Sequence, residues 1–214
     1  MTSAISFQCW AGIHTALPTA KLAYEAVKTL CGGQEGSDKV FLVGHSFGAH
    51  TVINMATLHA AERECSALKV RGMALLAPAG WNPVVSALLP PFIKAVYTKL
   101  LGFPSDLPSG HYMAGLIRAG TTDFGVIREQ VNALRELKLP SLVAWSQNDE
   151  FMEEDIPIEL ARLCYPGPRL AFASGAHNVQ KTRAEQIAEA VSKWIEEVSA
   201  DENEGEQQPT QQLP

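Results

Sequence analysis

Residues 40–50 constrain the fold more than any other part of the chain. Four apolar residues, Val40 to Val43, lead without a break into Gly44-His45-Ser46-Phe47-Gly48, and a stretch with helical spacing of apolar residues begins at Ala49. A continuous apolar run of this kind is typical of a strand that is buried on both faces of a sheet. The sequence therefore predicts a strand, a tight turn and a helix, with Ser46 at the turn.

The rest of the chain alternates short apolar runs with amphipathic stretches, which predicts an α/β fold with a mostly parallel sheet and helices on both faces. Further strands are expected at Ala4 to Trp10, Gly72 to Ala77, Ser141 to Trp145 and Leu170 to Ala173. Helices are expected from Thr19 to Leu30 and from the turn to about Cys65. A closing helix carries an apolar stripe of Ile187, Val191, Trp194, Ile195 and Val198.

A long insertion separates two of the expected strands. It has about sixty residues, which is too many for a plain crossover, and both Leu88 to Leu101 and Phe124 to Leu137 have helical patterns. We therefore expect residues 80–138 to form a helical lid, inserted into a core that consists of residues 1–79 and 139–199. The acidic and Gln-rich residues 200–214 are expected to be a disordered tail.

Composition argues against several classes of protein. The 214 residues have a net charge of −6, and their 17 Lys and Arg are scattered, so no nucleic-acid partner is expected. The four cysteines (Cys9, Cys31, Cys65 and Cys164) form no CxxC, which argues against a disulfide framework or a zinc site. Prolines and lysines interrupt the apolar stretch 84–103, so no transmembrane helix is expected. Residues 1–12 also lack the basic start of a secretory signal, and we expect a cytoplasmic protein.

Ser46 has the setting of a nucleophile. A strained turn between a strand and a helix lifts the serine oxygen above the sheet and requires small residues two positions before and after it, which are Gly44 and Gly48 here. The backbone N–H of Phe47, at the start of the helix, is placed to stabilise an oxyanion. The alternative interpretation is a helix-capping serine between two glycines.

A nucleophilic serine needs a base, and the base needs an acid that orients it. His177 follows the expected strand Leu170 to Ala173 in a loop of small residues, and Asp149 follows the expected strand Ser141 to Trp145. Both positions lie just past the carboxyl end of a strand, where α/β proteins collect their catalytic residues. We therefore expect His177 to be the base and Asp149 the acid.

Other histidines and acids compete for these roles, but each has a simpler interpretation. His45 is expected to point away from the turn. His50 and His59 lie on the following helix, where either a core-packed or a surface histidine is expected, and His14 and His111 have no motif around them. The remaining acids near Asp149 fit the acidic N-terminus of a helix; they are Glu150, Glu153, Glu154 and Asp155.

Together these residues resemble a known family. The segments Gly44 to Gly48, Leu75 to Gly80, Asn148 to Glu150 and Gly175 to His177 look like the α/β-hydrolase superfamily, from about residue 4 to residue 198. The resemblance implies an α/β-hydrolase fold in which Ser46, Asp149 and His177 form a catalytic triad. The segment from His177 to Ala184 is also similar, less specifically, to a branch best represented in nematodes.

The resemblance also implies strands for which the sequence has no match. In the family, an earlier strand ends in a His-Gly loop that supplies the second oxyanion amide, whereas Ala11-Gly12-Ile13-His14 has a different order. We therefore expect an N-terminally incomplete fold; the alternative is a divergent member of the family that fills the centre of the sheet in another way. We also expect low solubility, because a missing central strand would leave part of the core uncovered. Esterase turnover is expected to be weak or absent, because the loss of one oxyanion donor lowers the rate by about 10²–10³.

The function expected from the sequence is that of a serine hydrolase. It would cleave an ester or thioester of a hydrophobic small molecule through an acyl-enzyme, without a metal or cofactor. Apolar residues of the expected lid favour a hydrophobic acyl group; they are Leu88, Leu89, Phe92, Val96, Leu100 and Phe103. Two alternatives stay open: a non-catalytic or truncated binding protein of the same fold, and a hydrolase-fold enzyme of another class, such as a C–C hydrolase or an acyltransferase. The sequence does not determine the oligomeric state.

Overall fold

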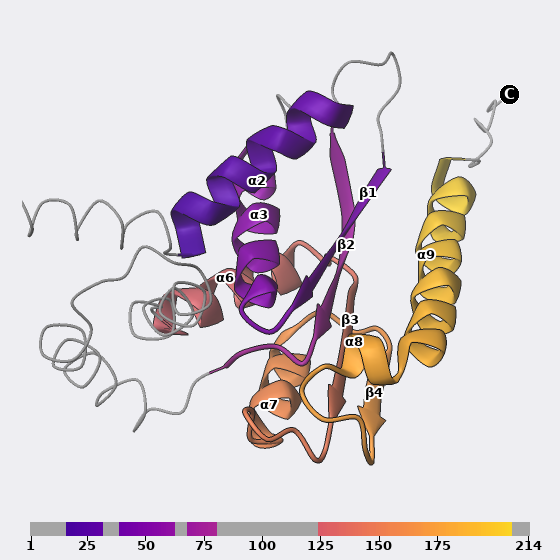
Figure 1. Ribbon diagram of the computed structural model, residues 1–214. Helices are drawn as coiled ribbons and strands as arrows, with labels where there is room; N and C mark the ends of the chain where they lie inside the picture. The colour runs from indigo at the N-terminus through magenta and orange to yellow at the C-terminus, as the bar shows by residue number, and fades with distance from the viewer. Residues whose placement is uncertain (1–15, 32–38, 63–67, 81–123, 207–214) are drawn as a thin grey trace, which may run out of the picture.

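The computed structural model describes residues 16–31, 39–62, 68–80 and 124–206, and these form a parallel sheet with helices on both faces (Figure 1). The strands are β1 (Lys39–His45), β2 (Lys69–Leu76), β3 (Ser141–Ser146) and β4 (Arg169–Phe172), and they lie in the order β1-β2-β3-β4. All three neighbouring pairs are parallel. The expected α/β fold is therefore confirmed, while the expected strand at residues 4–10 lies outside the described residues.

Both faces of β2 and β3 are buried, and their successive residues alternate between two hydrophobic clusters. One cluster takes Met73, Leu75, Val143 and Trp145. The other takes Ala74, Leu76, Leu142 and Ala144. This arrangement explains why the strands are continuously apolar, since neither face of the central strands meets water. The predicted burial of Val40 to Val43 on both faces is wrong for β1, where Val43 is 53% exposed.

One face of the sheet carries α2 (Ala16–Cys31), α3 (Gly48–Glu62), α6 (Phe124–Glu136) and α7 (Asp155–Leu163). Each of the last three helices connects two strands that are neighbours in the sheet. Because parallel crossovers are right-handed and the strand order runs in one direction, all three must lie on the same face. The N-terminal helix α2 packs beside α3 on this face, through the buried ring of Tyr24.

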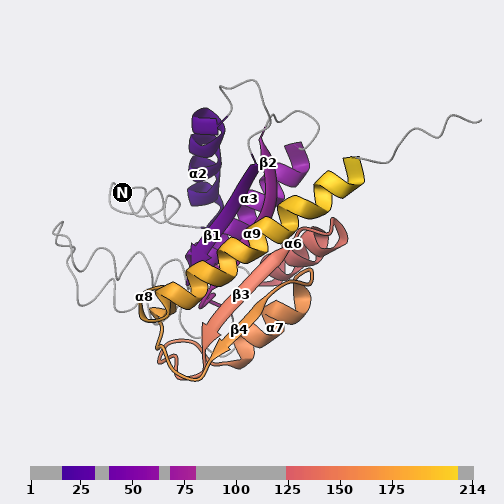
Figure 2. The same cartoon turned by 90° about the vertical axis from the view of Figure 1, so that its right-hand side faces the viewer.

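The opposite face carries α8 (Val179–Thr182) and α9 (Ala184–Glu206), and Figure 2 shows α9 lying along the sheet. The predicted apolar stripe of α9 belongs to the second cluster, with Ile187 and Trp194 buried. The ring of Trp194 packs edge-on against Phe41 at 5.4 Å between centroids. Gly72 makes room for it, because a Cβ there would lie 2.8 Å from the indole ring.

The end of α9 differs from the sequence expectation. We expected disorder from residue 200, but the helix continues to Glu206, and residues 207–214 lie outside the described residues. Asp and Glu residues are compatible with a helix, and Gly205 is the only helix breaker among residues 200–206. Composition alone therefore placed the end of the helix too early.

Part of the predicted lid, residues 80–138, takes a different place in the structure. The helix α6, which we counted as part of the lid, packs against α3, and its buried residues Ile127, Val131 and Leu134 belong to the core. Neighbouring parallel strands need a crossover helix, and α6 provides it between β2 and β3. The rest of the expected lid, residues 81–123, lies outside the described residues. None of the helices in the described ranges is both long and apolar enough to cross a membrane.

The packing of α9 gives a test of the fold. Trp194 is 3% exposed, so Trp194→Ala should lower the free energy of unfolding by about 3–5 kcal/mol through the lost burial and the cavity. The neighbouring Lys193 is the control, because its side chain is 76% exposed and Lys193→Ala should change stability by less than about 0.5 kcal/mol. Urea unfolding followed by circular dichroism measures both. Equal effects of the two variants would contradict the placement of α9.

Candidate active site

Ser46 lies in a tight turn between β1 and α3, with a positive φ of 54°. A left-handed backbone costs a non-glycine residue about 1–3 kcal/mol unless its surroundings stabilise it. Hydrogen bonds to the end of β2, to the residues after it and to the start of α3 stabilise the backbone of Ser46. Ser46 N–H donates to Leu76 O at 2.9 Å, and Ser46 O accepts from Ala79 N–H at 3.1 Å and from Ala49 N–H at 3.0 Å.

The structure brings Ser46, His177 and Asp149 together at the carboxyl ends of β1, β4 and β3. The Nε2 atom of His177 is 3.0 Å from Ser46 Oγ, and its Nδ1 atom is 2.8 Å from Asp149 Oδ2. Since a carboxylate only accepts, Nδ1 carries the proton, which leaves Nε2 to accept from the serine hydroxyl. The side chains of His177 and Asp149 are only 12% and 3% exposed, so water has little access to the contact between them.

The carboxyl group of Asp149 is held from both sides. Its second oxygen, Oδ1, accepts backbone N–H groups from Phe151 at 2.8 Å and from Met152 at 3.0 Å. These bonds fix the plane of the carboxyl group, and the other oxygen therefore points at the imidazole of His177. This geometry orients the ring.

The neighbouring acids do not reach the imidazole ring. Glu150 accepts the backbone N–H of His177 at 3.2 Å. Glu154 accepts the indole N–H of Trp145 at 3.2 Å and the amide of Gln147 at 3.0 Å. Glu153 and Asp155 line a pocket whose wall includes neither Asp149 nor His177. Asp149 is therefore the acid that contacts a ring nitrogen of His177.

Asn148 is a residue whose importance the sequence did not reveal. Its Oδ1 atom accepts three hydrogen bonds, from Ser146 Oγ at 2.6 Å, Gly175 N–H at 2.9 Å and Ala176 N–H at 3.0 Å. Ala176 also has a positive φ of 54°, which these bonds help to stabilise. Asn148 thus joins the loop that carries Asp149 to the loop that carries His177. In the sequence it has only the signature of a turn residue.

His45 takes a position that differs from the sequence expectation. We expected its ring to point away from the turn, but its Nε2 atom is 2.9 Å from the backbone oxygen of His177, and the two rings are 4.8 Å apart. Burial lowers the pKa of His45, and the hydrogen bond to His177 offsets this only in part. His45 is therefore neutral at physiological pH.

Two further histidines, His50 and His59, are buried, which is one of the two roles that the sequence left open for them. His50 Nε2 donates to Ala79 O at 2.6 Å. His59 contacts the hydroxyl of Tyr24 and the backbone N–H of Val70, both at 3.3 Å. His14 and His111 lie outside the described residues.

The two glycines of the turn are not equivalent. A Cβ at Gly44 would lie 2.8 Å from Ala49 N and closer still to the carbonyl group of Gly48, so no larger residue fits there. At Gly48, by contrast, no atom of the described residues outside its own helix and neighbours lies within 4 Å of an added Cβ. The sequence predicted a steric need for both glycines, but the close approach of strand and helix occurs only at Gly44. Phe47 lies between Ser46 and the first residue of α3.

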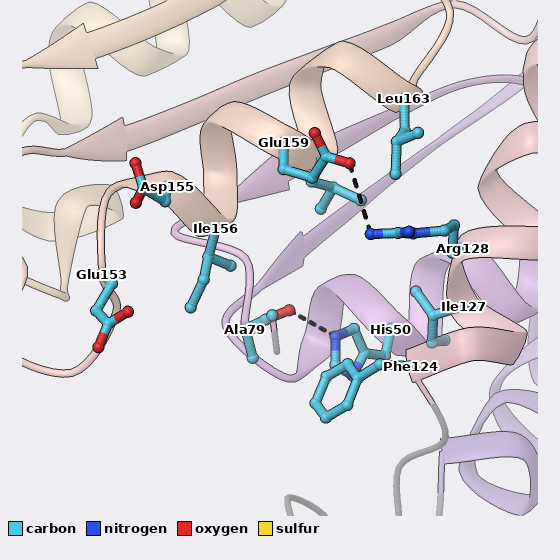
Figure 3. A pocket seen from close by; sticks show the side chains of 12 residues that line it. His50, Ala79, Phe124, Ile127, Arg128, Glu153, Asp155, Ile156, Glu159 and Leu163 are labelled. Atoms are coloured by element: carbon cyan, nitrogen blue, oxygen red, sulfur yellow. Dashed lines mark hydrogen bonds and ion pairs between the residues drawn. The ribbon is translucent and has the colours of Figure 1, made fainter. Parts of the chain in front are cut away.

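A pocket of about 340 Å³ lies between α3, α6, α7 and the residues that follow β2 (Figure 3). It reaches Ala79, the residue whose N–H holds Ser46, and His50, which is bonded to Ala79. Apolar side chains form much of its wall: Phe124, Ile127, Ile156, Leu160 and Leu163. Figure 3 shows Glu153 and Asp155 at one end and Arg128 near Leu163 at the other. Arg128 pairs with Glu159 at 3.5 Å.

Other reactive chemistry is not apparent in the described part of the chain. No group of three or more His, Cys, Asp or Glu side chains there is arranged to hold a metal ion. Cys31 and Cys164 are free thiols. Burial raises the pKa of the Cys164 thiol to about 11, so this thiol is not a nucleophile at neutral pH.

The asymmetry of the two glycines gives a test of the turn geometry. Gly44→Ala should lower the free energy of unfolding by at least about 1–3 kcal/mol, because the methyl group forces the start of α3 away from β1. Gly48→Ala should change it by no more than about 0.5 kcal/mol. Thermal unfolding of the two variants measures the difference. A Gly48 variant as unstable as the Gly44 variant would contradict the geometry described here.

Solved structures with a similar fold include three bacterial proteins. The lip1 protein of Acinetobacter baumannii AYE has a TM-score of 0.62 at 14% identity, covering 88% of this chain and 69% of that protein. A lipase-esterase related protein from Clostridium acetobutylicum ATCC 824 has a TM-score of 0.58 at 15% identity, covering 85% and 76%. Est1E from Butyrivibrio proteoclasticus has a TM-score of 0.56 at 19% identity, covering 88% and 73%. At these identities the likeness shows the fold alone.

The sequence itself identifies the family. No curated protein matches the chain, but the sequence pattern of the Alpha/beta hydrolase family matches residues 9–190, which is most of its length. The sheet, the turn at Ser46 and the similar structures agree with this match. The chain therefore belongs to the alpha/beta hydrolase family.

Proposed function

We propose that this protein is a serine hydrolase that cleaves esters or thioesters, with Ser46 as nucleophile, His177 as base and Asp149 as orienting acid. The observation that carries the proposal is the alignment of the three side chains, at 3.0 Å from Ser46 Oγ to His177 Nε2 and 2.8 Å from His177 Nδ1 to Asp149 Oδ2. A similar fold is found in a lipase-esterase related protein, which supports the same reaction class.

The proposed reaction uses each of these atoms. Ser46 Oγ attacks the carbonyl carbon of the substrate while its proton moves to His177 Nε2. Phe47 N–H, at the N-terminus of α3, donates to the oxyanion that forms. The imidazolium then protonates the departing alcohol or thiol, which leaves an acyl group on Ser46. Water then attacks the acyl-enzyme while His177 takes its proton, and the imidazolium returns that proton to Ser46 Oγ as the free acid leaves.

Asp149 supports both transfers without taking up the proton. Its Oδ2 atom fixes the tautomer in which Nδ1 carries hydrogen, and it stabilises the imidazolium between the two half-reactions. The near-complete burial of this carboxylate strengthens the interaction, because a low local dielectric screens charges weakly.

The pocket between α3, α6 and α7 is the proposed binding site for the acyl group of the substrate. It adjoins Ser46 through Ala79, and its wall is largely apolar, which suits a hydrocarbon chain or a ring. The residues of the expected lid that favoured a hydrophobic substrate lie outside the described residues. The preference for a hydrophobic acyl group therefore rests on Phe124, Ile127, Ile156, Leu160 and Leu163.

The proposed nucleophile can be tested directly with a fluorophosphonate probe and a short-chain aryl ester. The unaltered chain should be labelled and should release free acid, whereas Ser46→Ala should abolish both. Asp149→Asn should lower kcat by about 10⁴-fold, because the altered partner favours the wrong tautomer of the base. Ser192→Ala, an exposed serine of α9, is the matched control and should behave like the unaltered chain.

Other results of this experiment would contradict the proposal. A folded chain that takes no label would favour a non-catalytic binding protein. Labelling that persists in Ser46→Ala would place the nucleophile elsewhere. Transfer of the acyl group to an added alcohol in preference to water would indicate an acyltransferase.

The proposed acyl site predicts a change in chain-length preference. Leu163 lines the pocket beside Arg128, and Leu163→Trp should fill that end of it. The ratio of kcat/KM for an octanoyl ester to that for an acetyl ester should fall about tenfold or more, since each buried methylene contributes about 0.8 kcal/mol. Ile158→Trp is the control, because Ile158 lies on the same helix but is exposed and does not line the pocket. An unchanged ratio in Leu163→Trp would place the acyl group elsewhere.

A further inference from the structure

We propose that His45 is a positioning residue, which holds the main chain of His177 in place by donating its Nε2–H to the carbonyl oxygen of that residue. The inference rests on the proposed function, because the position of His177 matters most if it is the base. It assigns a role to the variable residue between Gly44 and Ser46, a place where the motif itself demands no particular side chain.

The first argument is the closed path of contacts that His45 completes. His45 precedes Ser46 in the chain, its ring bonds to the main chain of His177 at 2.9 Å, and the ring of His177 reaches back to Ser46 Oγ at 3.0 Å. The base is thus tied to the nucleophile's own turn by two separate bonds. A shift of residues 174–178 away from Ser46 would have to break the contact with His45 as well.

The second argument is that side chains hold both peptide groups of His177. Glu150 Oε2 accepts its N–H at 3.2 Å, and His45 Nε2 donates to its carbonyl oxygen at 2.9 Å. The loop before it is fixed by Asn148, but those bonds end at Ala176. His45 is therefore the contact that fixes the carbonyl side of the base, where the chain continues into α8.

The third argument concerns charge. A carbonyl oxygen only accepts, so His45 carries a hydrogen on Nε2, and in its neutral form Nδ1 is unprotonated. The burial that lowers the pKa of His45 keeps it in this form. Its ring is 4.8 Å from the ring of His177. A neutral ring at this distance does not oppose the positive charge that His177 acquires when it accepts the proton of Ser46.

Three substitutions separate the hydrogen bond from the bulk of the ring. His45→Gln keeps an amide N–H at the same number of bonds from Cβ as Nε2, His45→Asn places it one bond too short, and His45→Phe keeps a ring without a donor. We expect kcat for an aryl ester to fall about tenfold in the Asn and Phe variants, with KM within about twofold, because a net hydrogen bond of ordinary strength is lost. The Gln variant should retain most of kcat.

A second measurement does not depend on turnover. Hydrogen exchange of the His177 backbone amide, followed by NMR, should be faster in the Asn and Phe variants than in the unaltered chain and in the Gln variant. A merely structural role would lower the melting temperature of all three variants and raise KM together with the loss of kcat. That pattern would overturn the proposal, as would unaltered kcat and exchange in the Phe variant.

The two proposals fail in different ways. If the unaltered chain shows no Ser46-dependent turnover, the proposed function fails. The exchange measurement would then decide the positioning role by itself. Faster exchange of the His177 amide in the Asn and Phe variants would support it, and unchanged exchange would overturn it. If turnover depends on Ser46 but is equal in all His45 variants, only the positioning role is wrong.

Discussion

The attachment of the Ser46 turn to the end of β2 is the constraint on which the rest of the site depends. The left-handed backbone at Ser46 is unfavourable by itself, and it persists because its N–H and carbonyl groups bond to Leu76 and Ala79. The parallel pairing of β1 with β2 sets this contact, since His45 lies opposite Leu76 in the register. The close approach at Gly44 then starts α3 at once and leaves the serine oxygen above the sheet.

A parallel sheet brings the other two loops to the same edge, but it does not by itself place two side chains within hydrogen-bonding distance. That accuracy comes from contacts between the loops. Asn148 Oδ1 joins the loop after β3 to the loop after β4 with two backbone N–H bonds, and Asp149 Oδ1 is held by its own turn. The imidazole of His177 therefore meets Asp149 and Ser46 in loops that are already fixed, and in the proposed reaction such preorganisation limits the entropy lost when substrate binds.

Much of the sheet and the three central residues could be predicted from the sequence, because both follow from local patterns. Ser46, Asp149 and His177 each follow an apolar run. These runs form parallel strands, so the residues that follow them lie at the same edge of the sheet. The role of Asn148 and the direction of His45 could not be predicted, because they depend on contacts between residues 27 to 132 positions apart. The place of α6 was ambiguous for a related reason: its amphipathic pattern suits a lid or a crossover equally, and only the adjacency of β2 and β3 decides.

The geometry also couples the pocket to the serine. Ala79 donates its N–H to Ser46 O, and its own carbonyl oxygen accepts from His50 Nε2 at 2.6 Å, so a single residue belongs to the turn and to the pocket wall. The ring of His50 in turn packs edge-on against Phe124 at 5.5 Å between centroids. The turn at Ser46 and the proposed acyl pocket are therefore built on a shared residue, Ala79.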